Sequence, residues 1–509
     1  MTENIFCDRI SSVEPLILAE DIVKRIAIAV KAASIRIWVD VSFFDFDVTY
    51  EEDKLLLALL QEKAVAGVDV RLIVWSNTFT GTQRGVDPRV IQFEPNWRNK
   101  FAEICPAVKI KLAISPDPLH CHHNKNWIID GGIFVTGFPL THKTKIYSKE
   151  QIVVELYDNA TIVNGGSLYD FLYFFSLRWN SITNQELCYP VGQCETITES
   201  QIQLEAPPIA SKNPADVIHN VPTRALLTVR EGMYDANHFP IQRASGAKEL
   251  ISLLKGCESV REWYLDQIRQ SKIAIYMEGQ FFFDEDIINA LMERADAGVQ
   301  VLVLNTGRRP TNAYIQGVLA YDLYCQGKQN FDSRYLPVFQ ALDKCTKHPN
   351  VHLTFLAANF TKPADNYSLK IFNAKALGKG NNLVLKVHSK LALFDGTSYT
   401  VGSANIIDLS YLKTDGIGHT ELNIAIHHQN ATRAAFSVIL ERLLGPAFTP
   451  DISVMNFKQQ IELLIETANK NRVLWLDGQS IIGQIVGNER EAWLRVNDRM
   501  DLQIFSGWM

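Results

Sequence analysis

Two segments of this chain repeat a histidine, a lysine two residues later, and an aspartate five residues after the lysine. They are His123, Lys125 and Asp130 in "HNKNWIID" and His388, Lys390 and Asp395 in "HSKLALFD". Imidazole can act as nucleophile or as general acid and base near neutral pH, and ammonium groups can bind phosphate oxygens. Two such sets suit a reaction in which one imidazole attacks and the other protonates a leaving group, while the ammonium groups bind an anionic substrate. The repeat therefore predicts two half-sites that act together, with no metal and no other cofactor required.

The first set lies in "PLHCHHNKNWIID", where three histidines and a cysteine occupy four consecutive positions. Side chains alternate between the faces of a strand, so Cys121, His123 and Lys125 share one side and His120 and His122 the other. A zinc site needs three or four converging ligands, and neither face offers more than two of the usual donors. The segment alone therefore does not predict a metal site. We expect His120 and His122 to be solvent-facing or hydrogen-bonded at the mouth of the strand.

The elements that must position these sets also recur. The segment "IRIWVDVSFF" from Ile35 aligns with "IAIYMEGQFF" from Ile273, and both have the pattern of buried strands. Each is followed by a helical pattern that ends at a glycine, Gly67 or Gly298, and then by a second strand, "VDVRLIVW" or "VQVLVLN". This order predicts a parallel strand pair with a right-handed crossover in each half.

A carboxylate behind each imidazole would fix its tautomer and stabilise the imidazolium. The block "KEQIVVELYDNAT" from Lys149 aligns with "TELNIAIHHQNAT" from Thr420, which pairs Glu150 with Glu421. We expect these two glutamates to hold the two histidines. Asp130 and Asp395 have the opposite strand parity from their lysines, so we interpret them as structural anchors of the motif.

The duplicated pattern, followed in its second copy by "GSAN" at 402–405, resembles the catalytic signature of the phospholipase D superfamily. The resemblance implies an α/β fold of two duplicated α/β/α lobes with mixed central sheets, packed about a pseudo-twofold axis so that both motifs meet. It implies a covalent phosphohistidine, more often on the first-lobe residue, here His123, with His388 as the acid. Pseudo-symmetry leaves that order open. Ser403 and Asn405 are expected to bind the substrate phosphate.

The repeat places an N-terminal lobe at 1–231, with the connection between lobes at roughly 189–231, and a C-terminal lobe at 232–509. The second lobe carries extra residues at about 307–382. Long insertions of this kind are usually functional loops or mobile ones. The first lobe has "GFPLT" where the second has "GSANI", so Phe138 and Leu140 replace Ser403 and Asn405. Thr136, Thr141 or His142 could supply the missing donors, or this half of the pocket is apolar and suits a lipid.

Composition limits the partners. The 509 residues carry a formal net charge of -6, which argues against bulk binding of nucleic acid. Eight scattered cysteines suit a reducing compartment, and a Cys188–Cys194 disulfide is not expected. Neither a signal peptide nor a transmembrane helix is expected. We expect a monomer that meets a bilayer peripherally, in the cytosol or as a bacterial effector delivered into a host cell. The aromatic and arginine residues of 79–101 suit a membrane interface or an ordinary surface loop equally well.

The leading functional hypothesis is a phospholipase D that hydrolyses phosphatidyl lipids to phosphatidic acid and a free head group, with room for transfer to an alcohol. The strand "IYMEGQFF" resembles that of eukaryotic-like phospholipases D and favours a lipid substrate. The alternatives, in order, are a phosphatidyltransferase of the cardiolipin synthase kind, a nuclease or other phosphodiesterase, and a catalytically silent lipid-binding protein.

Overall fold

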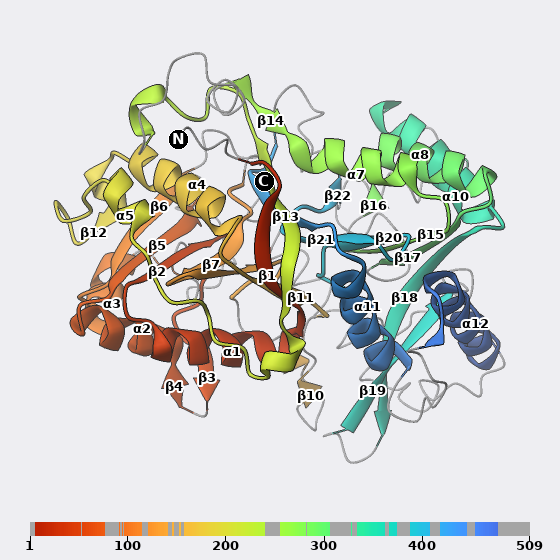
Figure 1. Ribbon diagram of the computed structural model, residues 1–509, viewed down its shortest axis with the longest axis horizontal. Coiled ribbons are helices and arrows are strands. Elements are labelled where there is room, and N and C mark those ends of the chain that lie inside the picture. Colours follow the sequence, from red (N-terminus) through yellow and green to blue (C-terminus); the bar gives the residue numbers. More distant parts are fainter. Residues whose placement is uncertain are drawn as a thin grey trace.

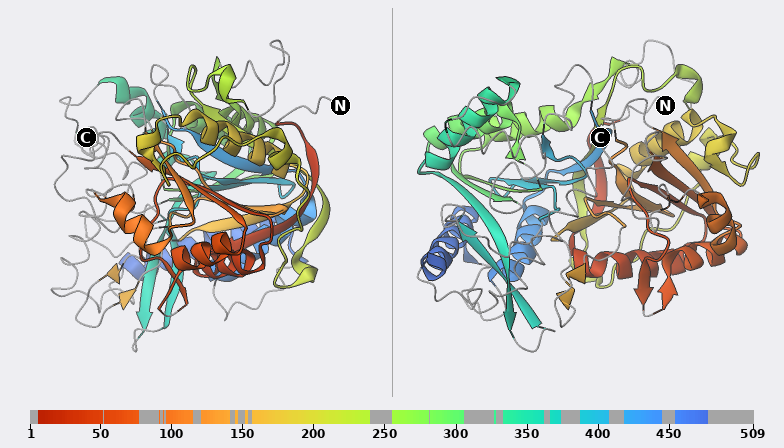
Figure 2. Two further views of the ribbon diagram at one scale, coloured as in Figure 1. Left: turned by 90° about the vertical axis from the view of Figure 1, so that its left-hand side faces the viewer. Right: turned by 180° about the vertical axis from the view of Figure 1, so that it is seen from behind.

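Two α/β/α lobes share one continuous sheet in the computed structural model (Figure 1). The structure describes the residues 6–51, 53–76, 91, 94, 96–114, 121–140, 145–146, 152–153, 157–239, 255–280, 282–305, 327, 333–361, 366–373, 387–407, 418–444 and 454–476. In each lobe, helices cover both faces of the sheet, and the views from the side and from behind show the same layers (Figure 2). The predicted α/β class is confirmed.

The first lobe contains the elements from the N-terminus to the connection. They are β1 (Arg9–Leu18), α1 (Ala19–Ala32), β2 (Arg36–Val41), β3 (Thr49–Glu51), β4 (Lys54–Leu55), α2 (Leu56–Val65), β5 (Asp69–Ser76), α3 (Trp97–Ile104), β6 (Lys109–Ile114), β7 (Lys125–Ile129), β8 (Gly132–Thr136), β9 (Lys145–Ile146), β10 (Ile152–Val153), β11 (Asn159–Asn164), α4 (Leu168–Ser181), β12 (Cys188–Tyr189) and α5 (Glu199–Gln203).

The second lobe repeats the same series with additions. Its elements are β13 (Ile218–Val229), β14 (Cys257–Glu258), α7 (Ser259–Gln270), β15 (Ala274–Gly279), β16 (Phe282–Phe283), α8 (Glu285–Asp296), β17 (Gln300–Asn305), α10 (Leu336–Lys347), β18 (Val351–Thr361), β19 (Asn366–Asn373), β20 (Leu391–Phe394), β21 (Ser398–Gly402), β22 (Ile406–Ile407), β23 (Glu421–Ile426), α11 (Gln429–Leu444) and α12 (Phe457–Leu476).

Strand pairing shows the duplication directly. In the first lobe β6, β5 and β2 are parallel neighbours, and β7, β8, β11 and β1 continue the sheet in antiparallel order. In the second lobe β18, β17 and β15 are parallel, and β20, β21, β23 and β13 follow in antiparallel order. The predicted parallel pairs are β2 with β5 and β15 with β17. Because helices cover both faces, the residues of β2 and β15 are all buried.

The lobes join where β1 and β13 run antiparallel, with Arg9 opposite Thr223 and Val13 opposite Ile218. These two strands lie side by side at the centre of Figure 1. β13 also pairs along its other edge with β23 of the second lobe. The range 189–231, expected to be a connection with parts as edge strands, therefore contains an interior strand that ties the two sheets together.

The range 307–382 contributes to the core of the second lobe in its described part. β18 lies beside β17 as β6 lies beside β5, and α10 packs against α8. β19 pairs with β18 and extends the sheet. The long hairpin of β18 and β19 projects beyond the helices in Figure 1.

Some expectations concern residues at the margins of the structure. Of the range 79–101, residues 79–90, 92–93 and 95 lie outside the described residues, as do 477–509. In the described part of the chain, no helix is both long and apolar enough to cross a membrane. None of the cysteines of that part, Cys188 and Cys194 included, forms a disulfide.

Candidate active site

The two H-x-K segments lie at the starts of β7 and β20, and alternation along the strand divides their side chains. His123 and His388 are each 7% exposed and the two lysines are almost completely buried. The middle residue of each motif faces away from them into the lobe. Asn124 Nδ2 donates to Asp40 Oδ2 at 2.9 Å on β2, and Ser389 Oγ donates to Glu278 on β15. An acid on the first strand of each repeat therefore fixes the strand that carries the histidine.

Each histidine is held by a carboxylate from the opposite lobe. His123 Nδ1 lies 3.0 Å from Glu421 Oε2, and His388 Nδ1 lies 2.8 Å from Asp158 Oδ2. The backbone supports both contacts, because His123 N donates to Thr420 O at 2.9 Å and His388 N donates to Tyr157 O at 2.8 Å. With Nδ1 bound to a carboxylate, a neutral ring exposes the lone pair of Nε2 to a substrate.

Glu421 was expected behind a histidine, and it contacts the histidine of the other lobe. Asp158, which contacts His388, was not among the residues expected from the sequence. Isolated β-bridges pair Tyr157 with Val387, just before His388, and Thr420 with His122, just before His123. Asp158 is therefore the structural counterpart of Glu421, because each follows the residue that forms its bridge. Glu150 lies outside the described residues.

A chance identity explains why Asp158 was missed. The alignment matched "NAT" at 159–161 with "NAT" at 430–432, although the first begins β11 and the second lies in α11. A usable signal was present in the sequence. Asp158 and Glu421 follow the closing glycines Gly137 and Gly402 at similar separations, whereas Glu150 comes much sooner after Gly137.

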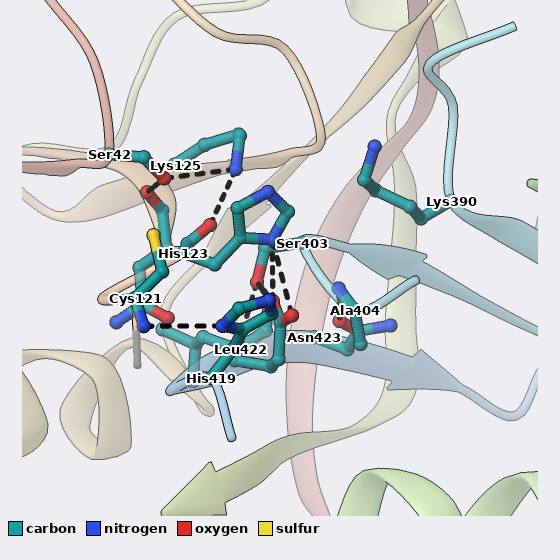
Figure 3. A network of polar contacts seen from close by, with 12 residues as sticks. Ser42, Cys121, His123, Lys125, Lys390, Ser403, Ala404, His419, Leu422 and Asn423 are labelled. Carbon is teal, nitrogen blue, oxygen red and sulfur yellow. Dashed lines mark hydrogen bonds and ion pairs between the residues drawn. The ribbon is translucent and has the colours of Figure 1, made fainter. Parts of the chain in front are cut away.

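The lysines lie next to the histidines. Lys125 Nζ donates to His123 O at 2.6 Å and to Ser42 Oγ at 3.0 Å, and Lys390 Nζ donates to His388 O. Lys125 and Lys390 flank the His123 ring in Figure 3. Burial lowers the pKa of Lys125 to about 8, although Glu421 and Asp158 oppose the shift. The site therefore concentrates positive charge where a phosphate would bind.

Burial and the two nearby ammonium groups hold the pKa of His123 well below its ordinary value. This ring is therefore neutral near pH 7, as a nucleophile must be. Burial also raises the pKa of the Asp158 carboxyl to about 7, against the pull of Lys390 and of the Asn159 N–H. The two carboxylates that hold the histidines thus have different surroundings.

Ser403 and Asn405, both expected to bind phosphate, differ in their contacts. Ser403 Oγ donates to Glu421 Oε2 at 2.6 Å and accepts from Leu422 N at 3.0 Å. It therefore supports the carboxylate behind His123. Asn405 is 2% exposed, and its Oδ1 has no hydrogen-bond partner within the described part of the chain.

The corresponding corner of the first lobe is apolar. Leu140 is buried and forms a bridge to Phe44. Thr136 Oγ1 donates to Asn159 O at 2.7 Å and accepts from Phe138 N at 2.9 Å, so its hydroxyl serves the backbone. The other two candidate donors, Thr141 and His142, lie outside the described residues.

Asp130 and Asp395 lie at the turns that end β7 and β20, with φ of 47° and 54°. Asp130 accepts from Ser34 N, Ser34 Oγ, Ile35 N and Arg36 N. Asp395 accepts from the backbone of Lys272, Ile273 and Ala274. Both carboxylates thus tie the motif to the start of the first strand in each repeat.

Two further residues of the histidine-rich segment have defined places. His122 is buried, not solvent-facing, and bridges to Thr420, while His120 lies outside the described residues. At the lobe interface, a Cβ on Gly137 would lie 3.0 Å from Asp158 Oδ1 and 3.0 Å from Lys390 Cδ. A side chain at this position would therefore crowd the contact between the lobes.

The paired sheets and reciprocal histidine–carboxylate contacts define one composite site to which both lobes contribute. Residues 264–443 match the family described as "Cardiolipin synthase, PLD-like domain". The match covers most of the second lobe, and this part of the chain is similar to the PLD-like domain of that family. No curated protein matches the sequence.

Several solved structures are similar to this chain, and the first of them supports the fold. Phosphatidylserine synthase from Haemophilus influenzae Rd KW20 is 10% identical with a TM-score of 0.50, over 94% of this chain and 97% of that one. Polyphosphate kinase from Porphyromonas gingivalis is 11% identical with a TM-score of 0.41, over 89% and 55% of the two chains. NucT from Helicobacter pylori is 13% identical with a TM-score of 0.23, over 36% and 86%.

Proposed function

We propose that this protein is a phosphatidyltransferase that moves a phosphatidyl group from a phospholipid to an alcohol, with hydrolysis as the competing reaction. The observation that carries the proposal is the reciprocal pair of histidine–carboxylate contacts beside two buried lysines. The match of residues 264–443 to the PLD-like domain of cardiolipin synthase favours transfer over the hydrolysis that the sequence placed first.

The proposed reaction has two steps. Nε2 of His123 attacks phosphorus, the bond from phosphorus to the head-group oxygen breaks, and His388 protonates the departing alkoxide. The phosphatidyl group is then bound to His123. His388, now neutral, removes the proton of an incoming alcohol, whose oxygen attacks phosphorus and releases His123. Water in place of the alcohol would give phosphatidic acid.

Three features support these assignments. The lowered pKa of His123 keeps its ring neutral before attack. Lys125 and Lys390 stand where they can stabilise the extra negative charge of the transition state. The histidines are largely buried, which limits the access of bulk water to a phosphohistidine.

The test uses vesicles of phosphatidylglycerol and phosphatidylethanolamine with deuterated glycerol, and mass spectrometry of the lipids with and without EDTA. We expect deuterated phosphatidylglycerol to exceed phosphatidic acid, and both products to disappear in His123→Ala and His388→Ala. The control is His348→Ala, since that ring contacts Asp296 at the surface of the second lobe. Phosphatidic acid as the sole product would restore the hydrolase, and cleavage of nucleic acid without lipid turnover would exclude both.

A further inference from the structure

Besides the contact between His123 and Glu421, hydrogen bonds of the described residues join the segment 121–123 to the second lobe. Two are between backbone groups: Thr420 N donates to Cys121 O at 2.8 Å, and His123 N donates to Thr420 O at 2.9 Å. Another uses a side chain, because Cys121 N donates to Nδ1 of His419 at 3.2 Å. His419 thus extends a backbone contact between lobes that ends at the reacting histidine.

The His419 ring is also packed against that histidine. It is 3% exposed, and its centroid lies 5.7 Å from the centroid of His123 with 37° between the planes. Figure 3 shows His419 beside His123 and bonded to Cys121. An imidazole that accepts a hydrogen bond at Nδ1 is neutral and carries its proton on Nε2. Two residues later, Glu421 binds His123 Nδ1, so one short segment fixes both the backbone and the ring of His123.

We propose that His419 is a positioning residue for His123, and that it acts by accepting the Cys121 N–H at Nδ1. The kinetic part of its test rests on the proposed transfer reaction. His419 does not move a proton in this scheme. It holds residues 121–123 in the register at which His123 meets Glu421 and faces the phosphorus of the substrate.

Within the described residues, no histidine holds the second half-site in this way, and the lobes are joined there by other contacts. There, His388 N and Ser389 N both donate to Tyr157 O, at 2.8 and 3.0 Å. The residue that corresponds to His419 in the chain is Leu156, and a leucine side chain has no acceptor atom. The third histidine therefore belongs to one half-site, the one assigned to the nucleophile.

Three substitutions separate positioning from other roles. His419→Asn places an amide oxygen near the position of Nδ1, His419→Gln places one near Nε2, and His419→Leu fills the volume without an acceptor. Misplacement of a reacting group by fractions of an ångström is costly. We expect kcat to fall about tenfold in His419→Leu and His419→Gln with KM within about twofold, and His419→Asn to stay within about threefold of wild type. Unchanged kcat in His419→Leu would overturn the proposal, as would activity retained by His419→Gln and lost by His419→Asn.

A second readout does not depend on turnover. Nitrogen-15 NMR of the full-length protein, with His123 signals assigned by their loss in His123→Ala, reports which ring nitrogen carries the proton. We expect the Nδ1–H form of His123 in wild type and His419→Asn, and a mixture of tautomers in His419→Leu. Identical His123 signals in wild type and His419→Leu would overturn the positioning role. A wild type without lipid turnover would count against the proposed function alone.

Discussion

The two half-sites present the same reacting groups on different supports. Each provides a histidine, a lysine and a carboxylate that crosses to the other lobe. Glu421 also accepts from Ser403 Oγ at 2.6 Å, whereas Asp158 accepts from the backbone N–H of Asn159 at 2.9 Å. Phe138 stands in the first lobe where Ser403 stands in the second. Duplication has thus kept the chemistry and let its supports diverge, which suits unequal roles for the two histidines.

The acids that bind the middle residue of each motif, Asp40 and Glu278, also have different partners. Asp40 of the first lobe binds Asn124 and the guanidinium of Arg178. Glu278 of the second lobe accepts from neutral donors, including Tyr157 Oη at 2.8 Å and Tyr276 Oη at 2.7 Å, and burial raises its pKa. A buried acid can therefore be stabilised by a cation or by several hydroxyl groups. Each lobe uses one of these solutions to hold its motif.

The largest expected effect comes from removing either histidine. We expect His123→Ala and His388→Ala to lower kcat by roughly 10³-fold or more, because each is essential to one step of the transfer. Initial rates on vesicles measure this loss. If the two histidines have unequal roles, His388→Ala still forms a phosphatidyl adduct slowly and His123→Ala forms none. Phosphatidyl adducts in both variants, or loss of activity in only one of them, would contradict unequal roles for two essential histidines.

Removing a carboxylate should cost less. Glu421→Gln and Asp158→Asn keep the size of the side chain but no longer stabilise an imidazolium, so we expect kcat to fall roughly 10²-fold. Steady-state kinetics on the same vesicles provide the measurement. Asp296→Asn, at the surface beside His348, is the control and should leave kcat unchanged. Full activity in Asp158→Asn would show that the first lobe does not support His388.

Lys125 should impose a pH limit. Its pKa is lowered to about 8, and it must be charged to bind phosphate, so kcat/KM should fall as pH rises through 8. The expected slope is about tenfold per pH unit above that value. A pH profile of wild type and Lys125→Arg tests this, because a guanidinium stays charged and the decline should move to higher pH. An unchanged profile in Lys125→Arg would assign the limit to another group.

Substitutions at Ser403 and Phe138, the matching positions of the two half-sites, should change kcat less than loss of a carboxylate does. Ser403→Ala removes a hydroxyl bond to Glu421, and we expect kcat to fall about fivefold to tenfold. Phe138→Ser places a hydroxyl in the first half-site, where Asp158 already has a backbone donor, and should change kcat by less than about threefold. Parallel kinetics compare the two. Equal losses from both substitutions would remove the distinction between the half-sites.

The smallest effect on catalysis is expected at the motif aspartates. Asp130→Ala leaves buried backbone N–H groups unpaired and should lower the free energy of unfolding by about 3 kcal/mol. Asp395→Ala should lower it somewhat less, because Asp395 accepts from fewer groups. Denaturant unfolding measures this, and activity per folded molecule should stay close to wild type. Loss of activity at unchanged stability would contradict an anchoring role.

Much of this arrangement could be predicted from the sequence because the repeat is local. The alternation around His123 and Lys125 predicted which side chains share a face of the strand. The glycines after α2 and α8 predicted the helix ends, where φ is 91° at Gly67 and 90° at Gly298. What crosses between lobes could not be predicted. Glu421 and Asp158 reach the opposite histidine because β1 and β13 join the two sheets, and no pattern within either repeat reports that joint.

The most direct test of the central claim is to locate the covalent phosphatidyl group. Rapid acid-free quenching of the enzyme with phospholipid, followed by proteolysis and mass spectrometry, reports which histidine carries the phosphorus. The account predicts the adduct on the peptide containing His123 in wild type, and more of it in His388→Ala when no alcohol is added. An adduct on His388, or turnover of lipid with no histidine adduct at all, would contradict it.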